Sequence, residues 1–348
     1  MKALVVFTSI RANQNFGKYA HNFTACNQTP DIIVIDETPV NRNIIKPQLK
    51  DFNAEFYGAE EISSWFNSRG LRSFKTVIPE RAHNKNSFGL LIALERGGYD
   101  MIVFLDDDTY PVAGCDFLGA HYQALNVKLP VRRSEGVWMN THPQYYAHGM
   151  PYCQRRKKTT WGIPNGFTGT VLNMGLWTGI PDLNAIDYLA LAPEWNPHLN
   201  VESFTVAPKQ FAPICGMNVA FKPEIIPAYY QLWHKGWDDL FGGLYVKVIA
   251  DHMGKGISVG KPLCVHAKEP RDLFKDIETE LPSMRLNEEL WKVLLSAEFT
   301  ESTWLGCYRE LAAHLKAKAK HLSPHYVTVQ TEKMNMWCEL TEKIEVSF

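Results

Sequence analysis

The stretch that most constrains this chain is a short apolar segment that runs directly into three aspartates. It reads MIVFLDDDTY and covers residues 101–110. The five apolar residues Met101–Leu105 are enough for a buried strand and too few for a helix. Adjacent carboxylates repel one another, so a chain rarely places three of them at a buried strand end without a cation. Hard oxygen ligands favour Mg²⁺ or Mn²⁺, although an isolated triplet would fit an acidic surface turn equally well.

Composition indicates an ordinary globular protein. The chain has 348 residues, of which 45% are hydrophobic, and a formal net charge of −1. Such values give no overall signal for a nucleic acid or a membrane as partner. The 7 cysteines include no Cys-x-x-Cys pair, which favours reduced thiols over a zinc cluster or disulfides. The apolar run at the N-terminus is too short for a signal peptide or a membrane span, so we expect a cytoplasmic protein.

Strands and helices are predicted to alternate in the first third of the chain. The predicted strands cover 3–7, 31–35 and 101–105, and the predicted helices cover 19–24, 60–67 and 83–96. This alternation predicts an α/β fold with a mostly parallel sheet covered by helices. Polar residues follow the three strands at Thr8–Arg11, Asp36-Glu37 and Asp106–Asp108. Because ligands of such sheets bind beyond the carboxyl ends of the strands, we expect a binding site there.

The remainder of the chain has a less regular pattern. Predicted strands cover 136–140, 171–177, 214–221 and 262–265, predicted helices cover 180–191 and 240–253, and a helical pattern of mixed charge begins at 286. We predict one ligand-binding domain at residues 1–280 and a C-terminal helical region, 281–348, packed on it. The dense charge run Arg155–Lys158 would by itself indicate only a solvated loop.

Three groups of residues could together hold a metal ion and a nucleotide. They are Asp106–Asp108, Asp238-Asp239 and His266. A hard divalent ion bound by carboxylates and an imidazole can take diphosphate oxygens at its open positions. Taken singly, His266 would more often be structural, and either aspartate would more often be a helix N-cap. The combined set is typical of the type A fold of glycosyltransferases.

Several longer runs resemble the reversibly glycosylated polypeptide family, whose plant members are UDP-arabinopyranose mutases. The similar runs are SFG (87–89), VLNMGLWTGIPDLNA (171–185), CGMNVAF (215–221), WDDLFGG (237–243), VKVIADHMGKG (246–256) and VHAK (265–268). The similarity covers residues 1–275. It implies a Rossmann-like mixed sheet of the type A glycosyltransferase fold, a UDP-sugar substrate and a metal ion at the three aspartates.

A candidate site follows from the chemistry and the resemblance together. We expect Mn²⁺ or Mg²⁺, and no flavin or nicotinamide, with the ligands Asp106, Asp108 and His266. The residues expected to bind the nucleotide are Thr8, Arg11, Asp36, Asn84, Lys85, Asp106 and Asp107. The residues expected to act on the sugar or on an acceptor are His148, Arg155, Asp238 and Asp239.

One segment departs from the family pattern. Where the family has Arg-Gly-Tyr-Pro-Phe-Ser-Leu-Arg, whose first arginine becomes reversibly glycosylated, this chain has HGMPYCQR at 148–155. Arg155 keeps the second arginine, whereas His148 replaces the first. An imidazole lacks the planar fork of donors of a guanidinium. We therefore expect no stable sugar adduct on His148, and the mutase reaction through that arginine is not expected.

Three functions are compatible with these features. The main interpretation is a metal-dependent glycosyltransferase that moves the sugar of UDP-arabinose, or of another UDP-pentose, to an external acceptor. The charges at Arg155–Lys158 would suit an anionic acceptor such as a nucleic acid or a charged glycan. The alternative is a UDP-arabinopyranose mutase, and a third option is a UDP-sugar-binding scaffold without turnover. An oligomer is compatible with each of them.

Overall fold

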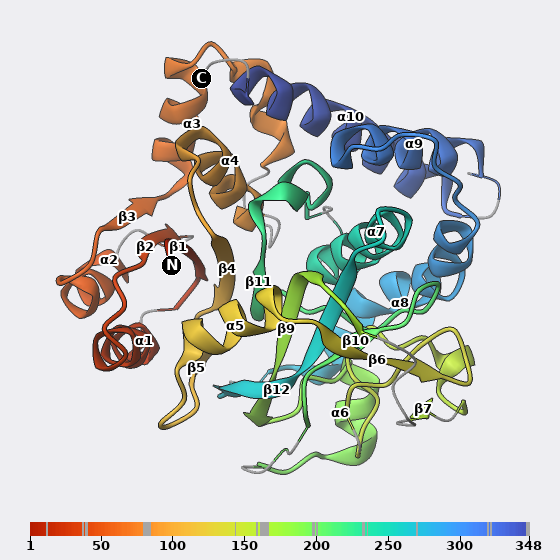
Figure 1. Ribbon diagram of the computed structural model, residues 1–348, viewed down its shortest axis with the longest axis horizontal. Helices are drawn as coiled ribbons and strands as arrows, with labels where there is room; N and C mark the ends of the chain where they lie inside the picture. The colour runs from red at the N-terminus through yellow and green to blue at the C-terminus, as the bar shows by residue number, and fades with distance from the viewer. Residues whose placement is uncertain are drawn as a thin grey trace.

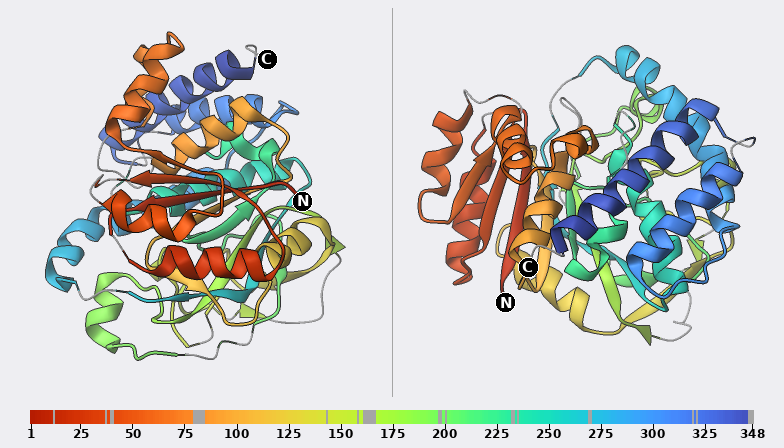
Figure 2. Two further views of the ribbon diagram at one scale, coloured as in Figure 1. Left: turned by 90° about the vertical axis from the view of Figure 1, so that its left-hand side faces the viewer. Right: turned by 90° about the horizontal axis from the view of Figure 1, so that it is seen from above.

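A mixed sheet with helices on both faces forms the centre of the molecule, as Figures 1 and 2 show. The structure is a computed structural model that describes residues 1–11, 13–36, 38, 41–78, 85–142, 144–157, 159–160, 167–196, 199, 201–231, 234, 236–268, 271–318, 320 and 322–345. Among these residues the sheet is 12-stranded, with the main order β3-β2-β1-β4-β11-β9-β12-β10-β6-β7.

The elements have the following bounds. The strands are β1 (Ala3–Ser9), β2 (Asp31–Asp36), β3 (Ala54–Tyr57), β4 (Met101–Asp106), β5 (Thr109–Pro111), β6 (Leu129–Ser134), β7 (Thr159–Thr160), β8 (Phe167–Thr168), β9 (Thr170–Gly179), β10 (Phe204–Val206), β11 (Asn218–Phe221) and β12 (Gly256–His266). The helices are α1 (Asn15–Ala25), α2 (Arg42–Ile45), α3 (Ala59–Ser68), α4 (Asn86–Arg96), α5 (Phe117–Asn126), α6 (Ala185–Leu191), α7 (Asp238–His252), α8 (Leu273–Leu295), α9 (Trp304–Ala317) and α10 (Pro324–Glu345). Short 3₁₀ helices are η2 (Lys46–Leu49), η3 (Arg72–Val77), η5 (Tyr152–Gln154) and η6 (Pro223–Ala228).

The strands β3, β2, β1 and β4 are parallel neighbours and form the N-terminal half of the sheet. The apolar residues of β1, β2 and β4 are buried on both faces, as expected for parallel strands covered by helices, whereas those of the edge strand β3 are only partly buried. In register, Thr8 lies opposite Asp106, and Ser9 lies opposite Asp36. The polar strand ends therefore meet at one edge of the sheet, as predicted.

The second half of the sheet mixes strand directions. Strand β11 runs antiparallel to both β4 and β9, while β9 is parallel to β12. Strand β12 is antiparallel to β10, which in turn is parallel to β6. A parallel half continued by a mixed half is the predicted type A glycosyltransferase arrangement, and the predicted fold class is confirmed.

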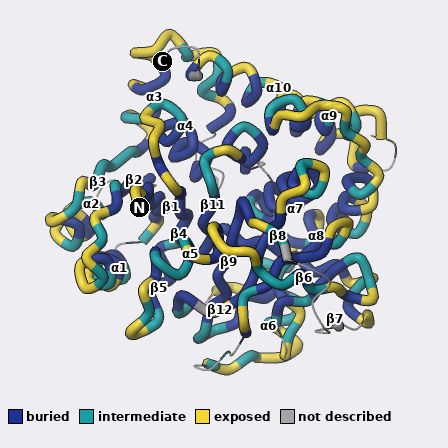
Figure 3. Tube along the Cα trace, in the orientation of Figure 1, coloured by how far each residue is buried: buried dark blue, intermediate teal, exposed yellow. Residues whose placement is uncertain are grey.

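The C-terminal helices α9 and α10 pack against η6, α7 and α4, and lie along the top of the molecule in Figure 1. The rings of Tyr230 and Trp337 are stacked with centroids 5.0 Å apart, so α10 shares the core of the sheet domain. Figure 3 shows buried residues in both parts, and they belong to one hydrophobic core. The predicted division at residue 280 falls inside α8, and one helix runs across it. None of the described helices is long and apolar enough to cross a lipid bilayer.

Three predicted elements differ from the observed ones. The strand predicted at 136–140 is wrong: this stretch contains an isolated bridge from Trp138 to Phe211, and the strand is β6. The polar sequence LPVRRS of β6 forms a strand because β10, β7 and β8 pair with it, which a local pattern does not reveal. The predicted helix 180–191 begins only at Ala185, because Asn184 caps it. The strand predicted at 214–221 is confined to Asn218–Phe221.

Close packing of α4 on β1 gives a first prediction. A Cβ atom on Gly89 would lie 2.6 Å from Cγ2 of Val6. We expect Gly89→Ala to lower the free energy of unfolding by about 1–3 kcal/mol, because the helix must move away from the strand. Gly242→Ala in α7 is the matched control, since its new Cβ would meet no atom nearer than 3.5 Å. Urea denaturation measures both, and a Gly89→Ala variant as stable as wild type would contradict the prediction.

Candidate functional site

The pairing of β5 with β12 brings Asp108 and His266 together. The last residue of β4 is Asp106, and a tight turn at Asp107 and Asp108 leads into β5. Strand β5 pairs antiparallel with the end of β12, with Thr109 opposite His266. The amide of Ala267 donates to the carbonyl oxygen of Asp108 at 2.9 Å. As a result, Nε2 of His266 lies 3.7 Å from Oδ2 of Asp108.

The environment of His266 fits a metal ligand. Its Nδ1 lies 2.8 Å from the carbonyl oxygen of Ile180, which can only accept, so Nδ1 carries the hydrogen and donates it. The lone pair of Nε2 is then directed toward Asp108. An ion at about 2.1 Å from each ligand needs a nitrogen–oxygen separation of roughly 3–4 Å, which this pair has. Among the described residues no three His, Cys, Asp or Glu side chains form a ready cluster, so phosphates and water would complete the shell.

The middle aspartate has a different environment. Asp107 is 4% exposed, and its Oδ2 accepts from the amides of Ile10 and Arg11 at 2.8 Å each. Its Oδ1 accepts from Nη1 of Arg11 at 2.9 Å. Burial raises the pKa of Asp107 despite these bonds. Because both carboxylate oxygens are engaged, Asp107 holds the loop after β1 in place, and Arg11 thereby comes within 3.6 Å of Asp108.

The other residues predicted for the nucleotide lie at the ends of β1 and β2 and at the start of α4. The hydroxyl of Thr8 donates to Oδ1 of Asn86, and Lys85, 4% exposed, occupies the N-cap position of α4. Asp36 is buried and accepts from Nη2 of Arg42 at 2.9 Å. These positions surround the same sheet edge as Arg11. The predicted residue Asn84 lies outside the described residues.

Two functional candidates, Asp182 and Lys268, were missed by the sequence reasoning. Asp182 lies between β9 and α6, and Lys268 follows His266 by two positions. The ammonium of Lys268 lies 2.8 Å from Oδ1 of Asp182, and Nδ1 of His148 lies 3.6 Å from Oδ2. The structure therefore places His148 and Lys268 on either side of one buried carboxylate. Both missed residues lie in runs that resemble the family, which was the only sequence signal for them.

Charges within this cluster stabilise one another. Burial alone would raise the pKa of Asp182, but Lys268 and His148 hold it well below its usual value. Burial alone would lower the pKa of His148, but the Asp182 carboxylate outweighs burial and raises it. Burial also acts to raise the pKa of Asp108, and the neighbouring His266 and Arg11 reverse this and lower it. Asp108 and Asp182 are therefore favoured as carboxylates, with cations close by.

Both aspartates of the predicted pair Asp238-Asp239 lie in the first turn of α7. The N-cap is Trp237, so the interpretation of either aspartate as an N-cap is wrong. Asp238 is 1% exposed and accepts from the amide of His234. Asp239 is more exposed, and its Oδ2 accepts from the amide of Gly216 at 2.6 Å. The ring of His148 packs edge-on against Trp237 with centroids 5.0 Å apart, which places the start of α7 beside the cluster.

Arg155 is anchored away from solvent. Its Nη2 lies 2.8 Å from Oδ2 of Asp187 in α6, and its guanidinium lies 3.7 Å from the centre of the Tyr152 ring. The residue is 8% exposed. The following residues Arg156 and Lys157 are exposed, and Lys158 lies outside the described residues. The predicted charge run therefore divides into one anchored arginine and an exposed outer part.

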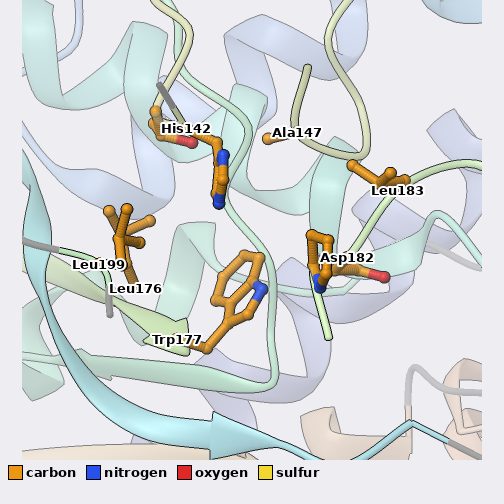
Figure 4. Close-up of a pocket in the computed structure, with 9 residues that line it drawn as sticks. His142, Ala147, Leu176, Trp177, Asp182, Leu183 and Leu199 are labelled. Atoms are coloured by element: carbon orange, nitrogen blue, oxygen red, sulfur yellow. The ribbon is translucent and has the colours of Figure 1, made fainter. Parts of the chain in front are cut away.

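A small cavity adjoins the cluster. Figure 4 shows the ring of His142 and the indole of Trp177 near Asp182 at its wall. Its volume is ≈ 10 Å³, which is room for about one water molecule. A nucleotide-sugar therefore does not fit inside it in this conformation. Two larger hollows, of ≈ 650 and ≈ 530 Å³, lie against α3 and α10 and between α9 and α10, away from the acidic strand ends.

The sheet and its acidic carboxyl-terminal edge define an enzyme of the type A glycosyltransferase fold. The chain belongs to the reversibly glycosylated polypeptide family, whose model matches residues 3–346. The similarity to this family that the sequence runs indicate covers residues 1–275. The family match continues through α9 and α10, so these helices belong to the family architecture.

Curated relatives match most of the chain. UDP-arabinopyranose mutase 3 of Arabidopsis thaliana is 34% identical over 309 residues, which cover 84% of this chain and 79% of that protein. Probable UDP-arabinopyranose mutase 2 of Solanum tuberosum is 32% identical over 328 residues, covering 90% and 83%. A solved structure, Mycobacterium tuberculosis glucosyl-3-phosphoglycerate synthase with Mn²⁺ and UDP-glucose, is 12% identical, covers 82% of this chain and 78% of its own, and has a TM-score of 0.42. A likeness that distant supports no argument about the site.

Direct binding tests the two metal-ligand candidates. If Asp108 and His266 hold the ion, we expect Asp108→Asn and His266→Gln each to weaken Mn²⁺-dependent UDP binding by at least ~10-fold, because each would remove a ligand. Titration calorimetry with UDP, with and without Mn²⁺, measures this change, and circular dichroism checks the fold. Asp51→Asn, at an exposed turn, is the control and should bind as wild type does. Unchanged metal-dependent affinity in both variants would exclude these residues as ligands.

Proposed function

We propose that this enzyme interconverts the pyranose and furanose forms of UDP-arabinose. The observation that carries the proposal is the buried cluster of His148, Asp182 and Lys268 beside Asp108 and His266. Membership of a family with curated mutases supports the same reaction and favours it over transfer to an external acceptor, which was our main interpretation of the sequence.

The reaction places two demands on the site. Changing the ring form breaks the C1–O5 bond of the sugar and makes a C1–O4 bond. In a route that balances, the diphosphate leaves C1, O4 bonds to C1 as its hydroxyl gives up a proton, and the returning diphosphate displaces O5, which takes up a proton. Cations must stabilise the departing diphosphate, and Arg11 and Lys268 are the cations near Asp108. A divalent ion, Mn²⁺ or Mg²⁺, held by Asp108 and His266 with Asp106 as the further candidate, would supply Lewis-acid neutralisation of the same charge.

The second demand is proton transfer at the sugar hydroxyls. His148 carries an imidazole that can hold or release a proton near neutral pH, which a guanidinium cannot. Asp182 orients this imidazole and stabilises its protonated form. We assign His148 as the proton carrier, Asp182 as its orienting partner, and Asp239 as a carboxylate that binds a sugar hydroxyl.

The setting of the reaction follows from the same features. The substrate is a UDP-sugar bound at the ends of β1, β2 and β4, where Thr8, Arg11, Asp36 and Lys85 lie. The 7 cysteines are all free in the structure, which fits a reducing compartment such as the cytoplasm. The proposal holds for a monomer or an oligomer.

Product analysis tests the reaction. Purified protein incubated with UDP-arabinopyranose and Mn²⁺ should form UDP-arabinofuranose without any acceptor. His148→Gln should lower kcat by at least ~100-fold, because the proton carrier is lost while the fold remains. His325→Gln, at an exposed position of α10, is the matched control and should keep the wild-type rate. Chromatography of the nucleotide-sugars measures both forms, and the absence of furanose with the wild-type protein would sink the proposal.

Transfer to an external acceptor is the second candidate. The exposed side chains of Arg156 and Lys157, which follow the anchored Arg155, favour it, since they would suit an anionic acceptor. Under this reaction, labelled sugar passes from UDP to an added polyanion, and replacing both cations by alanine weakens the transfer in a salt-dependent way. The same replacement leaves the ring interconversion unchanged, so the two reactions are distinguished in one protein preparation.

The two aspartates of α7 are expected to differ. Asp239→Asn should lower kcat by at least ~100-fold with the fold retained, because the carboxylate is partly exposed and each of its oxygens can accept from a sugar hydroxyl besides the amide of Gly216 or Leu240. Asp238→Asn should instead lower the free energy of unfolding by about 1–3 kcal/mol, because this buried carboxylate accepts from a backbone amide. Steady-state kinetics and thermal unfolding separate the two effects. A normal rate in Asp239→Asn would return this residue to a purely structural role.

A further inference from the structure

Helix α8 contacts the segment 148–155 through two consecutive residues. Nδ2 of Asn287 donates to the carbonyl oxygen of Gly149 at 2.7 Å. The carboxylate of Glu288 accepts from the amide of Tyr152 at 2.6 Å and from the amide of Cys153 at 3.3 Å. One turn of a C-terminal helix therefore holds the segment at two points, three residues apart along its backbone.

The bonds from Glu288 stabilise the beginning of η5. The first amides of a short helix have no partner within it, and an anion at that end satisfies them and interacts favourably with the helix dipole. Tyr152 and Cys153 are the first two residues of η5, so Glu288 supplies this anion. The turn leads directly into Arg155, whose guanidinium pairs with Asp187. The carboxylate of Glu288 thus fixes the direction in which the segment continues.

The bond from Asn287 is shielded from solvent. Asn287 is 2% exposed, and its partner Gly149 has a φ of +90°. A Cβ atom on Gly149 would lie 3.0 Å from Cδ2 of Leu240, so the backbone also passes close to α7. A hydrogen bond inside such a contact is costly to break, because the released groups have little access to water. The segment is therefore held between α7 and α8.

The contacts of α8 with the segment affect His148, which is the residue before Gly149. Its amide donates to the carbonyl oxygen of Asp182 at 3.1 Å, and its Nδ1 faces the Asp182 carboxylate. Its Nε2 is buried without a hydrogen-bond partner in the structure. That nitrogen is the free end of the imidazole, and its position depends on how the backbone at 148–149 is held.

We propose that Asn287 and Glu288 are positioning residues of the active site, and that α8 sets the place of His148. The catalytic part of this inference rests on the proposed function, whereas the holding of the segment by α8 does not. The proposal gives the C-terminal helical region a role in the reaction that its sequence pattern did not indicate. If α8 had only a structural role, changing Asn287 or Glu288 would lower the free energy of unfolding and would not lower kcat while leaving KM unchanged.

Two adjacent glutamates provide a matched pair of variants. Glu288→Ala removes the acceptor of the two η5 amides, while Glu289→Ala removes an exposed carboxylate that pairs with Lys292 at 2.7 Å. We expect Glu288→Ala to lower kcat by about 10- to 100-fold, because a displacement of ~1 Å at a reacting group has an effect of that size. The KM and the affinity for UDP should change by less than about twofold, because binding of UDP does not involve the segment. Glu289→Ala should match wild type, and Glu288→Gln, which keeps one acceptor oxygen, should recover part of the rate.

Hydrogen exchange supplies a readout that does not depend on turnover. The amides of Tyr152 and Cys153 should exchange faster in Glu288→Ala than in wild type or Glu289→Ala, because their acceptor is gone. Asn287→Asp, which removes the donor to Gly149, should give the same loss of kcat. If the wild-type protein is active and Glu288→Ala shows faster exchange with a normal kcat, the positioning role is overturned. If the amides of Tyr152 and Cys153 exchange at the same rate in Glu288→Ala as in wild type, Glu288 does not anchor the segment. If the wild-type protein makes no furanose, the proposed function is rejected. The exchange rates then still decide whether α8 anchors the segment.

Discussion

The site depends on one piece of backbone pairing, the antiparallel contact between β5 and the end of β12. Strand β4 delivers three acids to the edge of the sheet, but only the turn into β5 directs Asp108 toward another strand. Pairing of Thr109 with His266 then fixes the separation of the two candidate ligands at 3.7 Å. A shift of this register by one residue would turn the His266 side chain to the other face of β12. The carboxylates are tolerable at this edge because Arg11, Lys268 and a divalent ion can balance their charge.

The residues proposed for the nucleotide and those proposed for the sugar come from different parts of the chain, and this division follows the order of the elements. Residues proposed for the nucleotide come from β1, β2, β4 and the start of α4, which form one parallel block. Residues proposed for the sugar come from later segments: His148 from the loop before η5, Asp182 from the loop before α6, and Asp239 from α7. The parallel block is built from local βα units. The sugar side is assembled by contacts between distant parts of the chain, including the C-terminal helix α8.

This division explains which features the sequence could predict. The apolar run Met101–Leu105 and its aspartates identify β4 and the acidic edge, because a short buried strand has a local signature. The runs that resemble the family identify the fold class, and the apolar pattern at 262–265 places His266 at a strand end. The bond from Glu288 to the amide of Tyr152 joins residues 136 positions apart and has no local signature. For the same reason the strand β6 and the pairing of Asp182 with Lys268 were missed, since each is defined only by partners distant in sequence.

The change from arginine to histidine at position 148 lies entirely on the sugar side of this division. The strand ends proposed to bind the nucleotide keep the residues that the family resemblance implies for them, so the proposed recognition of UDP need not change with it. His148 occupies a buried position between Asp182 and Trp237, where an imidazole is oriented by a carboxylate and can exchange a proton. A guanidinium there would stay charged at every accessible pH. Under the proposed reaction, the substitution would alter how the sugar is handled after it leaves the diphosphate, in a segment that α8 contacts at two points.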